Sequence, residues 1–217
     1  MSNNELARHV TDELHWDPKV DNSTIAVTAD DDGIVTLRGT VGSFREKRDA
    51  QHDAEQIYGV AQVKNDLDVR ILTEHKREDA ELRSDVLQAL MLDSVVPRTV
   101  DAKVSDGIVK LSGKVTFQFQ RSEAESVAGN VSGVLGLEDD IQLVPPGPAK
   151  HDVEHSIKKA MERSAKLDAE SVDVSSENGT ITLRGTVSSW ADHDAAVNAA
   201  WSAPGVTRVK DHIFVAY

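Results

Sequence analysis

Cysteine is absent from the sequence, so disulfides, thiolate metal sites and thiol nucleophiles are excluded. Aromatic residues make up only 4% of the 217 residues, so a core must be built from Val, Leu, Ile and Ala. No run of about 18 apolar residues, the length of a membrane-spanning helix, occurs. The first residues also lack the basic and apolar regions of a signal peptide. We therefore expect no transmembrane segment and a cytoplasmic location.

Basic side chains are in the minority, with 24 Lys and Arg against 37 Asp and Glu and a formal net charge of −13. A surface of this sign repels phosphate backbones at long range, so we expect no nucleic-acid partner. The same repulsion opposes attachment to anionic lipid. Residues 150–217 are the least acidic third of the chain, with 8 basic and 10 acidic side chains.

One segment of the sequence occurs three times, as GIVTLRGTV at 33–41, GIVKLSGKV at 107–115 and GTITLRGTV at 179–187. The second glycine of each copy, here called the repeat glycine, is Gly39, Gly113 or Gly185. Twenty residues later each copy has a Gly–Val pair, which begins at Gly59, Gly133 or Gly205. The copies are 74 and 72 residues apart, so each unit is a small domain rather than a solenoid turn.

The same five elements are predicted in each unit, in the order α-β-β-α-β. Apolar residues at helical spacing, such as Leu6, Val10 and Leu14, open the unit. Two alternating strands follow, joined by a turn rich in Asp, Ser, Asn and Gly, which is typical of a hairpin. A side chain at the repeat glycine would crowd a neighbour or a bulge. A second helix is predicted to end at the Gly–Val glycine in the left-handed conformation, before a last strand.

Two alanines recur four residues apart in every second helix. They are Ala50 and Ala54, Ala124 and Ala128, and Ala196 and Ala200. Such a pair makes a flat stripe, so we expect each helix to lie close on its sheet.

The glycine-anchored hairpin, the alanine-paired helix, the Gly–Val turn and the last strand, VKNDLDV or VKDHIFV, together resemble the BON domain family. The resemblance covers residues 4–71, 79–144 and 150–216, and the middle copy departs most, with LEDDIQL in its last strand. It implies an α+β fold of three tandem domains, each a three-stranded mixed sheet covered on one face by two helices. The strand order is left open.

The resemblance implies a non-enzymatic binding protein that associates with phospholipid or cell-envelope surfaces in osmotic or general stress; many BON relatives are periplasmic. One alternative is a cytosolic potassium-binding protein, because some BON relatives bind potassium; carbonyls of the Gly–Val turns or hairpin carboxylates would supply the ligands. Another is a holdase-like chaperone or scaffold with avidity from three linked copies. Domains of about 70 residues are marginal alone, so we expect the copies to dock on one another or the chain to form a homo-oligomer.

The candidate contacts with a ligand or partner are Trp201 and the turn glycines Gly59, Gly133 and Gly205. Trp201 stands out because the matched residues in the other copies are Glu55 and Gly129. Trp190 matches Phe44 in the first copy and is therefore predicted to be a core residue.

We predict neither a metal site nor a cofactor. HDVEH at 151–155 places two histidines one helical turn apart, as in some zinc sites, but no third ligand is identified. Asp30, Asp31 and Asp32 lack the EF-hand order and are better explained by a turn; the pair Asp139 and Asp140 is weaker still. The matched positions are Gly, Ala and aliphatic residues, and no nucleophile-elbow, Walker or dinucleotide motif occurs, so we predict no enzymatic activity.

Overall fold

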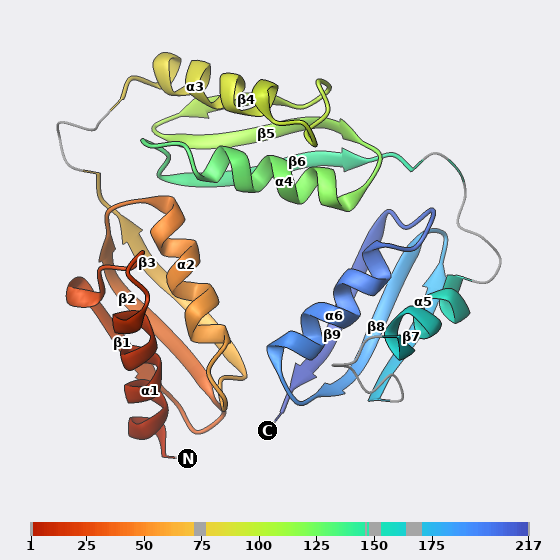
Figure 1. Cartoon of the computed structure of the whole chain (residues 1–217), viewed down its shortest axis with the longest axis horizontal. Helices are drawn as coiled ribbons and strands as arrows, with labels where there is room; N and C mark the ends of the chain where they lie inside the picture. Colours follow the sequence, from red (N-terminus) through yellow and green to blue (C-terminus); the bar gives the residue numbers. More distant parts are fainter. Residues whose placement is uncertain (1, 72–76, 146, 148–152, 164–170, 217) are drawn as a thin grey trace.

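The computed structural model describes residues 2–71, 77–145, 147, 153–163 and 171–216. Within these residues the chain forms three small α+β domains, each with two helices on one face of a three-stranded sheet (Figure 1). This architecture confirms the predicted fold class.

The elements follow the predicted order in every domain. The first domain contains α1 (Asn3–Trp16), a 3-10 turn (Asn22–Thr24), β1 (Ile25–Ala29), β2 (Ile34–Val41), α2 (Phe44–Glu55) and β3 (Gln62–Val69). The second contains α3 (Asp79–Leu92), β4 (Asp101–Ser105), β5 (Ile108–Val115), α4 (Gln118–Gly129) and β6 (Gly136–Leu143). The third contains α5 (Val153–Glu162), β7 (Val172–Glu177), β8 (Thr180–Val187), α6 (Trp190–Trp201) and β9 (Arg208–Val215).

The strand order, which the sequence left open, is the same in all three sheets. The second strand of each domain lies in the centre; it pairs antiparallel with the first strand and parallel with the last. The parallel pairing requires a crossover connection, and the second helix provides it. This helix therefore runs over the sheet from the end of the central strand back to the start of the last strand, so its two ends lie at opposite ends of the domain.

The paired alanines let the second helix lie close to the sheet. All six are fully buried in the three hydrophobic cores, together with the apolar stripe of each first helix, such as Leu6, Val10 and Leu14. The predicted helical spacing is thereby confirmed.

The repeat glycines lie where no other residue fits. Gly39 has φ +137°, and a Cβ there would lie 1.9 Å from the carbonyl oxygen of Thr24. At Gly185 the corresponding distance to the Ser171 carbonyl oxygen is 2.0 Å. The glycine allows the neighbouring strand segment to approach closely.

The predicted end of the second helix is wrong. Helix α2 ends at Glu55, four residues before Gly59, and Gln56 caps it by donating its backbone N–H to the carbonyl of His52. The chain then leaves the helix through a turn in which Val60 N donates to the Ile57 carbonyl at 3.1 Å. Gly59, with φ +98°, is a residue of that separate turn and not the left-handed cap of the helix.

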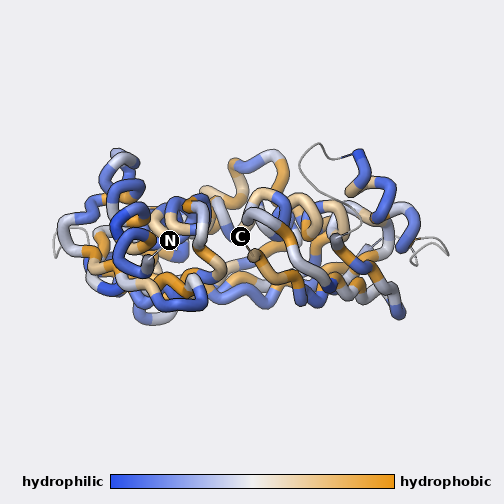
Figure 2. The backbone as a smooth tube through the Cα atoms, turned by 90° about the horizontal axis from the view of Figure 1, so that it is seen from below, coloured by the Kyte–Doolittle hydropathy of each residue, from blue (hydrophilic) through white to orange (hydrophobic). Residues whose placement is uncertain are grey.

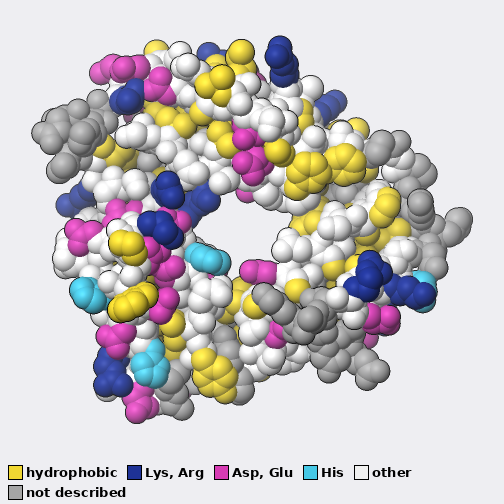
Figure 3. All heavy atoms as spheres, viewed as in Figure 1, with side chains coloured by type: hydrophobic (Ala, Val, Ile, Leu, Met, Phe, Trp, Pro, Cys, Tyr) yellow, Lys and Arg dark blue, Asp and Glu magenta, His cyan; other side chains and the backbone are white. Residues whose placement is uncertain are grey.

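The three domains form a flat ring. Figure 1 shows the second helices arranged head to tail around it, and Figure 2 shows the ring edge-on as a thin layer. All helices lie on one side of the ring and the open faces of the sheets lie on the other (Figure 1). Figure 3, seen from the helix side, shows an opening between the domains.

Candidate functional site at the domain junctions

Each domain meets the next through the ends of its second helix. The start of that helix in one domain lies near the end of the second helix, or the following Gly–Val turn, of the next. The order is first to second, second to third, and third back to first (Figure 1). The equivalent residues at the start of the three helices are Phe44, Gln118 and Trp190.

At the junction of the first and second domains, a phenyl ring lies over a glycine. Phe44 packs against the core of the second domain, and a Cβ at Gly129 would lie 3.2 Å from its ring. The same Cβ would lie 2.8 Å from Nη1 of Arg48. Gly129 thus provides the space that Phe44 and Arg48 occupy. Phe44 matches Trp190 in sequence, yet it contributes to a neighbour's core, which the sequence did not indicate.

An acidic side chain near this junction has a strongly shifted pKa. Burial raises the pKa of Glu125 to about 7, and a hydrogen bond to Asp139 and the negative charge of Asp139 act in the same direction. The positive charges of Arg121 and Arg48 oppose the shift. Because Arg48 belongs to the first domain and Glu125 to the second, the protonation of Glu125 changes the charge that Arg48 faces.

At the junction of the third and first domains, a hydrogen bond closes the ring. Trp190 packs against the core of its own domain, and its indole Nε1 donates to the carbonyl oxygen of Val60 at 2.9 Å. The two residues are 130 positions apart in the sequence. Trp190 is therefore both a core residue, as predicted, and a junction residue, which was not predicted.

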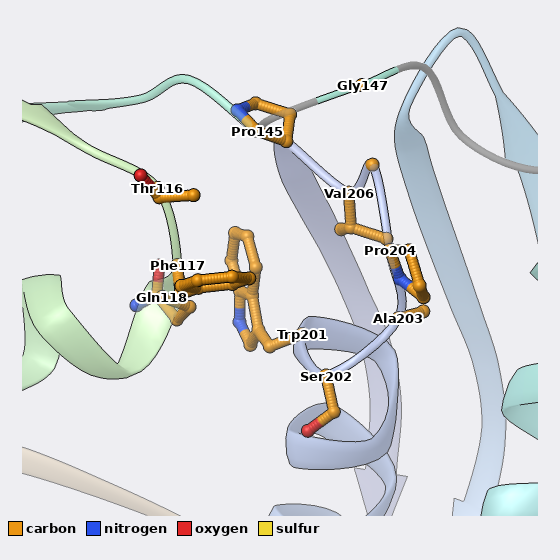
Figure 4. A pocket seen from close by; sticks show the side chains of 11 residues that line it. Thr116, Phe117, Gln118, Pro145, Gly147, Trp201, Ser202, Ala203, Pro204 and Val206 are labelled. Carbon is orange, nitrogen blue, oxygen red and sulfur yellow. The ribbon is translucent and has the colours of Figure 1, made fainter.

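At the junction of the second and third domains a pocket remains. Trp201 packs against the core of the third domain and also lines this cavity of about 300 Å³. Phe117 and Gln118 from the second domain form the facing wall (Figure 4). Trp201 thus lies at a boundary between domains, next to two residues that the sequence analysis did not single out.

Two aromatic rings beside this pocket are exposed. Phe117 is 49% exposed and Phe119 is 59% exposed. Their rings stack with centroids 5.6 Å apart and planes 14° from parallel. Exposed neighbouring aromatics in a chain with so few of them point to a contact surface. The sequence carries a signal for this pair, since Phe117 and Phe119 have no aromatic counterparts in the other copies.

The Gly–Val turns lie at three different corners of the ring (Figure 1). Each turn shares a pocket with the end of the last strand of the preceding domain: Gly59 with Val215, Gly133 with Val69, and Gly205 with Pro145 just beyond β6. The carbonyls of Gly59, Gly133 and Gly205 therefore do not converge on one ion. Potassium binding stays a prediction, and it would have to use each turn separately.

The acidic turn of the first domain satisfies its own backbone. Oδ1 of Asp30 accepts hydrogen bonds from the backbone N–H of Asp32 at 3.1 Å and of Ile34 at 2.8 Å. Asp31 accepts one from Nδ2 of Asn3 at 2.6 Å. Among the described residues, no group of three or more His, Asp or Glu side chains is placed to hold a metal ion. His151 and Asp152 of the HDVEH segment lie outside the described residues.

Matched polar pairs tie each second helix to the last strand. His193 Nε2 lies 2.7 Å from Oδ2 of Asp211, a pair that resembles part of a catalytic triad. The same position in the second domain holds Arg121, which pairs with Asp139. In the first domain, Nδ2 of Asn65 donates to the carbonyl of Lys47 at 2.7 Å. Since the three pairs differ in chemistry but share their place, they serve to fasten helix to strand.

The other candidate carboxylate of the second domain is also paired. Asp140, next to Asp139 in β6, lies 2.7 Å from Nζ of Lys110 on the neighbouring strand. Both members of the Asp139–Asp140 pair thus have a cationic partner within their own domain.

No helix in the part of the chain that the structure describes is long and apolar enough to cross a bilayer.

Comparisons with known proteins agree with the repeat. The model of the BON domain matches residues 2–71, 78–145 and 150–217. "Osmotically-inducible protein Y" of Escherichia coli (strain K12) is 35% identical over 117 residues, which cover 52% of this chain and 58% of that protein. The alignment therefore spans little more than half of either protein.

Two solved structures of CdsD, a structural protein of the type III secretion system of Chlamydia trachomatis, were also matched. Their TM-scores are 0.27 and 0.26 at 15% and 16% identity. The first match covers 96% of this chain and 91% of that one, and the second covers 100% of both. The family match extends over nearly the whole chain in three copies, and the chain belongs to the BON domain family.

Proposed function

We propose that this chain is a non-enzymatic binding protein of the osmotic stress response that attaches to anionic phospholipid surfaces through the open face of its third sheet. The name of its E. coli relative supports the link to osmotic stress. The observation that carries the membrane part is an exposed phenylalanine among basic side chains on that sheet.

The open face of the third sheet is the side away from α5 and α6. Three basic side chains, Arg184, Arg208 and Lys210, lie exposed on it against two carboxylates, Asp173 and Glu177. This surplus is small, but it stands out in a chain of net charge −13. Basic side chains near an anionic membrane each contribute about 1 kcal/mol of attraction.

Phe214 gives this face an apolar anchor. It lies near the end of β9, opposite Thr186 of β8, and is 71% exposed. His212 lies on the same face, opposite Arg184. An exposed aromatic ring flanked by basic residues is typical of proteins that lie on the headgroup region without crossing it. Because the open sheets lie on one side of the ring (Figure 1), the helices face away from the membrane in this orientation.

Co-sedimentation with vesicles tests this proposal. We expect the chain to pellet with phosphatidylglycerol-containing vesicles at low salt, to pellet less at high salt because screening weakens the attraction, and to remain in solution with pure phosphatidylcholine. Reversing two charges in Arg208→Glu/Lys210→Glu should weaken binding by at least about tenfold. Arg38→Glu/Lys64→Glu is the matched control, since it reverses the same number of charges on the open face of the first sheet. A chain that stays in the supernatant with anionic vesicles at low salt contradicts the proposal.

A further inference from the structure

The junction between the second and third domains differs from the other two in that the first residue of its second helix is not aromatic. Phe44 fills the first junction by packing on the second domain, and Trp190 reaches Val60 across the third. The equivalent residue of the second domain is Gln118, which has no ring to insert. A cavity of about 300 Å³ remains at this junction, lined by Gln118, its neighbour Phe117 and, from the third domain, Trp201.

The walls of this cavity are suited to an aromatic guest. Phe117 and Trp201 provide two aromatic surfaces, and Pro145, Pro204 and Val206 provide the apolar remainder (Figure 4). Aromatic rings gain about 0.5–1.5 kcal/mol from such neighbours beyond the burial of their area. The volume is at the lower limit of the 300–1,000 Å³ that is typical of ligand sites. It therefore favours one ring over a larger apolar body.

A second hollow continues from the cavity and indicates that the ring is carried on a chain. It measures about 490 Å³, shares Phe117 and Trp201 with the cavity, and is also lined by Phe119, Ser122, Glu123 and Asn198. Ser122 and Asn198 offer side-chain hydrogen bonds to a polypeptide backbone, which a free aromatic molecule would not use. Glu123 places a carboxylate beside the ring position. A basic residue next to the aromatic one would complement that charge.

We propose that this junction binds a short segment of another protein that carries a Phe or Trp side chain next to a basic residue. The ring of the partner enters the cavity at Gln118. At the other two junctions the matched residues, Phe44 and Trp190, supply a ring from the chain itself. A second copy of this chain is a poor partner, because two bodies of charge −13 repel each other. This proposal concerns the edge of the ring between two domains and does not depend on the sheet face that is proposed to bind lipid.

The test is a titration of the full chain with the peptide acetyl-Ser-Lys-Phe-Lys-Ser-amide, followed by the indole N–H resonances of the ¹⁵N-labelled protein. Trp16→Phe and Trp201→Phe variants assign the signals. We expect the Trp201 resonance to shift while that of Trp16, which is 83% exposed on α1, stays in place. Replacing the phenylalanine of the peptide by alanine should weaken binding at least about tenfold, as for a buried aromatic anchor.

Two variants of the protein distinguish binding in the cavity from nonspecific binding elsewhere on the surface. Gln118→Phe supplies the missing ring from within and should weaken peptide binding about tenfold, whereas Gln118→Asn should bind as the parent chain does. Should Gln118→Phe misfold, Phe119→Ser takes its place, because Phe119 is exposed and lines the peptide hollow. It should weaken binding several-fold, and the shift is measured from the Trp201 resonance of the free variant, because Phe119 stacks on Phe117 beside Trp201.

Four outcomes would overturn the proposal: no shift of Trp201, equal binding of the alanine peptide, equal binding of N-acetylphenylalaninamide alone, or the same Trp201 shift with neutral phosphatidylcholine vesicles. The third outcome would assign the cavity to small aromatic molecules and the fourth to acyl chains. Arg208→Glu/Lys210→Glu should leave the peptide titration unchanged, so failure of the lipid proposal and failure of this one are distinguishable.

Discussion

Replacing Gly185 by alanine should unfold the third domain at far lower denaturant than the parent chain. The new Cβ would lie 2.0 Å from the carbonyl oxygen of Ser171, which is backbone and cannot rotate away. At φ +150° the alanine would also sit in a backbone region that costs about 1–3 kcal/mol. Relieving the overlap by shifting β7 from β8 costs a further amount of about 1–3 kcal/mol. A domain of about 70 residues has only about 3.5–10 kcal/mol of stability in total.

Urea unfolding followed by tryptophan fluorescence checks this expectation. Two of the three tryptophans, Trp190 and Trp201, are partly buried in the third domain, so the fluorescence change reports mainly on that domain. Circular dichroism should show the rest of the chain unfolding at higher urea. Gly147→Ala is the control, because a Cβ there meets nothing within 4 Å, and its midpoint should agree with the parent within about 0.5 kcal/mol. A Gly185→Ala chain whose fluorescence transition overlays that of the parent would refute the close-approach argument.

Two further predictions concern the other junctions. Since the pKa of Glu125 is raised to about 7 in the folded chain, its contribution to stability is full below pH 4.5 and is lost as the pH rises to 7. The free energy of unfolding should fall by about 1–2 kcal/mol between these pH values, because the group is partly exposed. Urea midpoints at pH 5 and pH 8 measure this loss, and the variant Glu125→Gln should abolish it. Trp190→Phe keeps a ring but removes the hydrogen bond to Val60, at a cost of about 0.5–1.5 kcal/mol to ring closure. Spin labels at Arg38→Cys and Arg184→Cys, unambiguous in a chain without cysteine, should show a broader distance distribution in this variant; an unchanged distribution would mean that the bond does not hold the ring closed.

The fold within each domain could be predicted because local sequence rules determine it. Hairpin turns, the alanine stripe and the apolar helix face each follow from residues close in sequence, and the structure places them as expected. The end of the second helix was predicted wrongly for the same reason. Gly59 marks a turn, but the carbonyl of His52 already receives its capping bond from Gln56, so the helix stops before the glycine. A recurring glycine indicates that a turn is present. It does not indicate whether the glycine belongs to the end of the helix or to the separate turn that follows.

The junctions could not be predicted in this way, because they depend on which domain lies beside which. Phe44 and Trp190 are matched aromatics on amphipathic helices, and that pattern is the same for a residue in its own core and for one in a neighbour's. Trp201 was singled out because its counterparts, Glu55 and Gly129, are so different. The mismatch was the informative signal. Applied to the start of the helix, the same test would have identified Gln118 as the position without a ring.

The three copies have matching residues at the positions that determine the fold of each domain, and different residues at the positions where the domains meet. These differences determine the order of the domains in the ring. Gly129 leaves room for the ring of Phe44, since a Cβ there would lie 3.2 Å from the ring and push it aside. If the third domain followed the first, Phe44 would instead meet Trp201, and two large side chains would compete for one site. Gln118 facing Trp201 avoids that conflict and leaves the cavity. The residues that disagree between copies therefore fix which end docks on which, and they leave one of the three equivalent sites open.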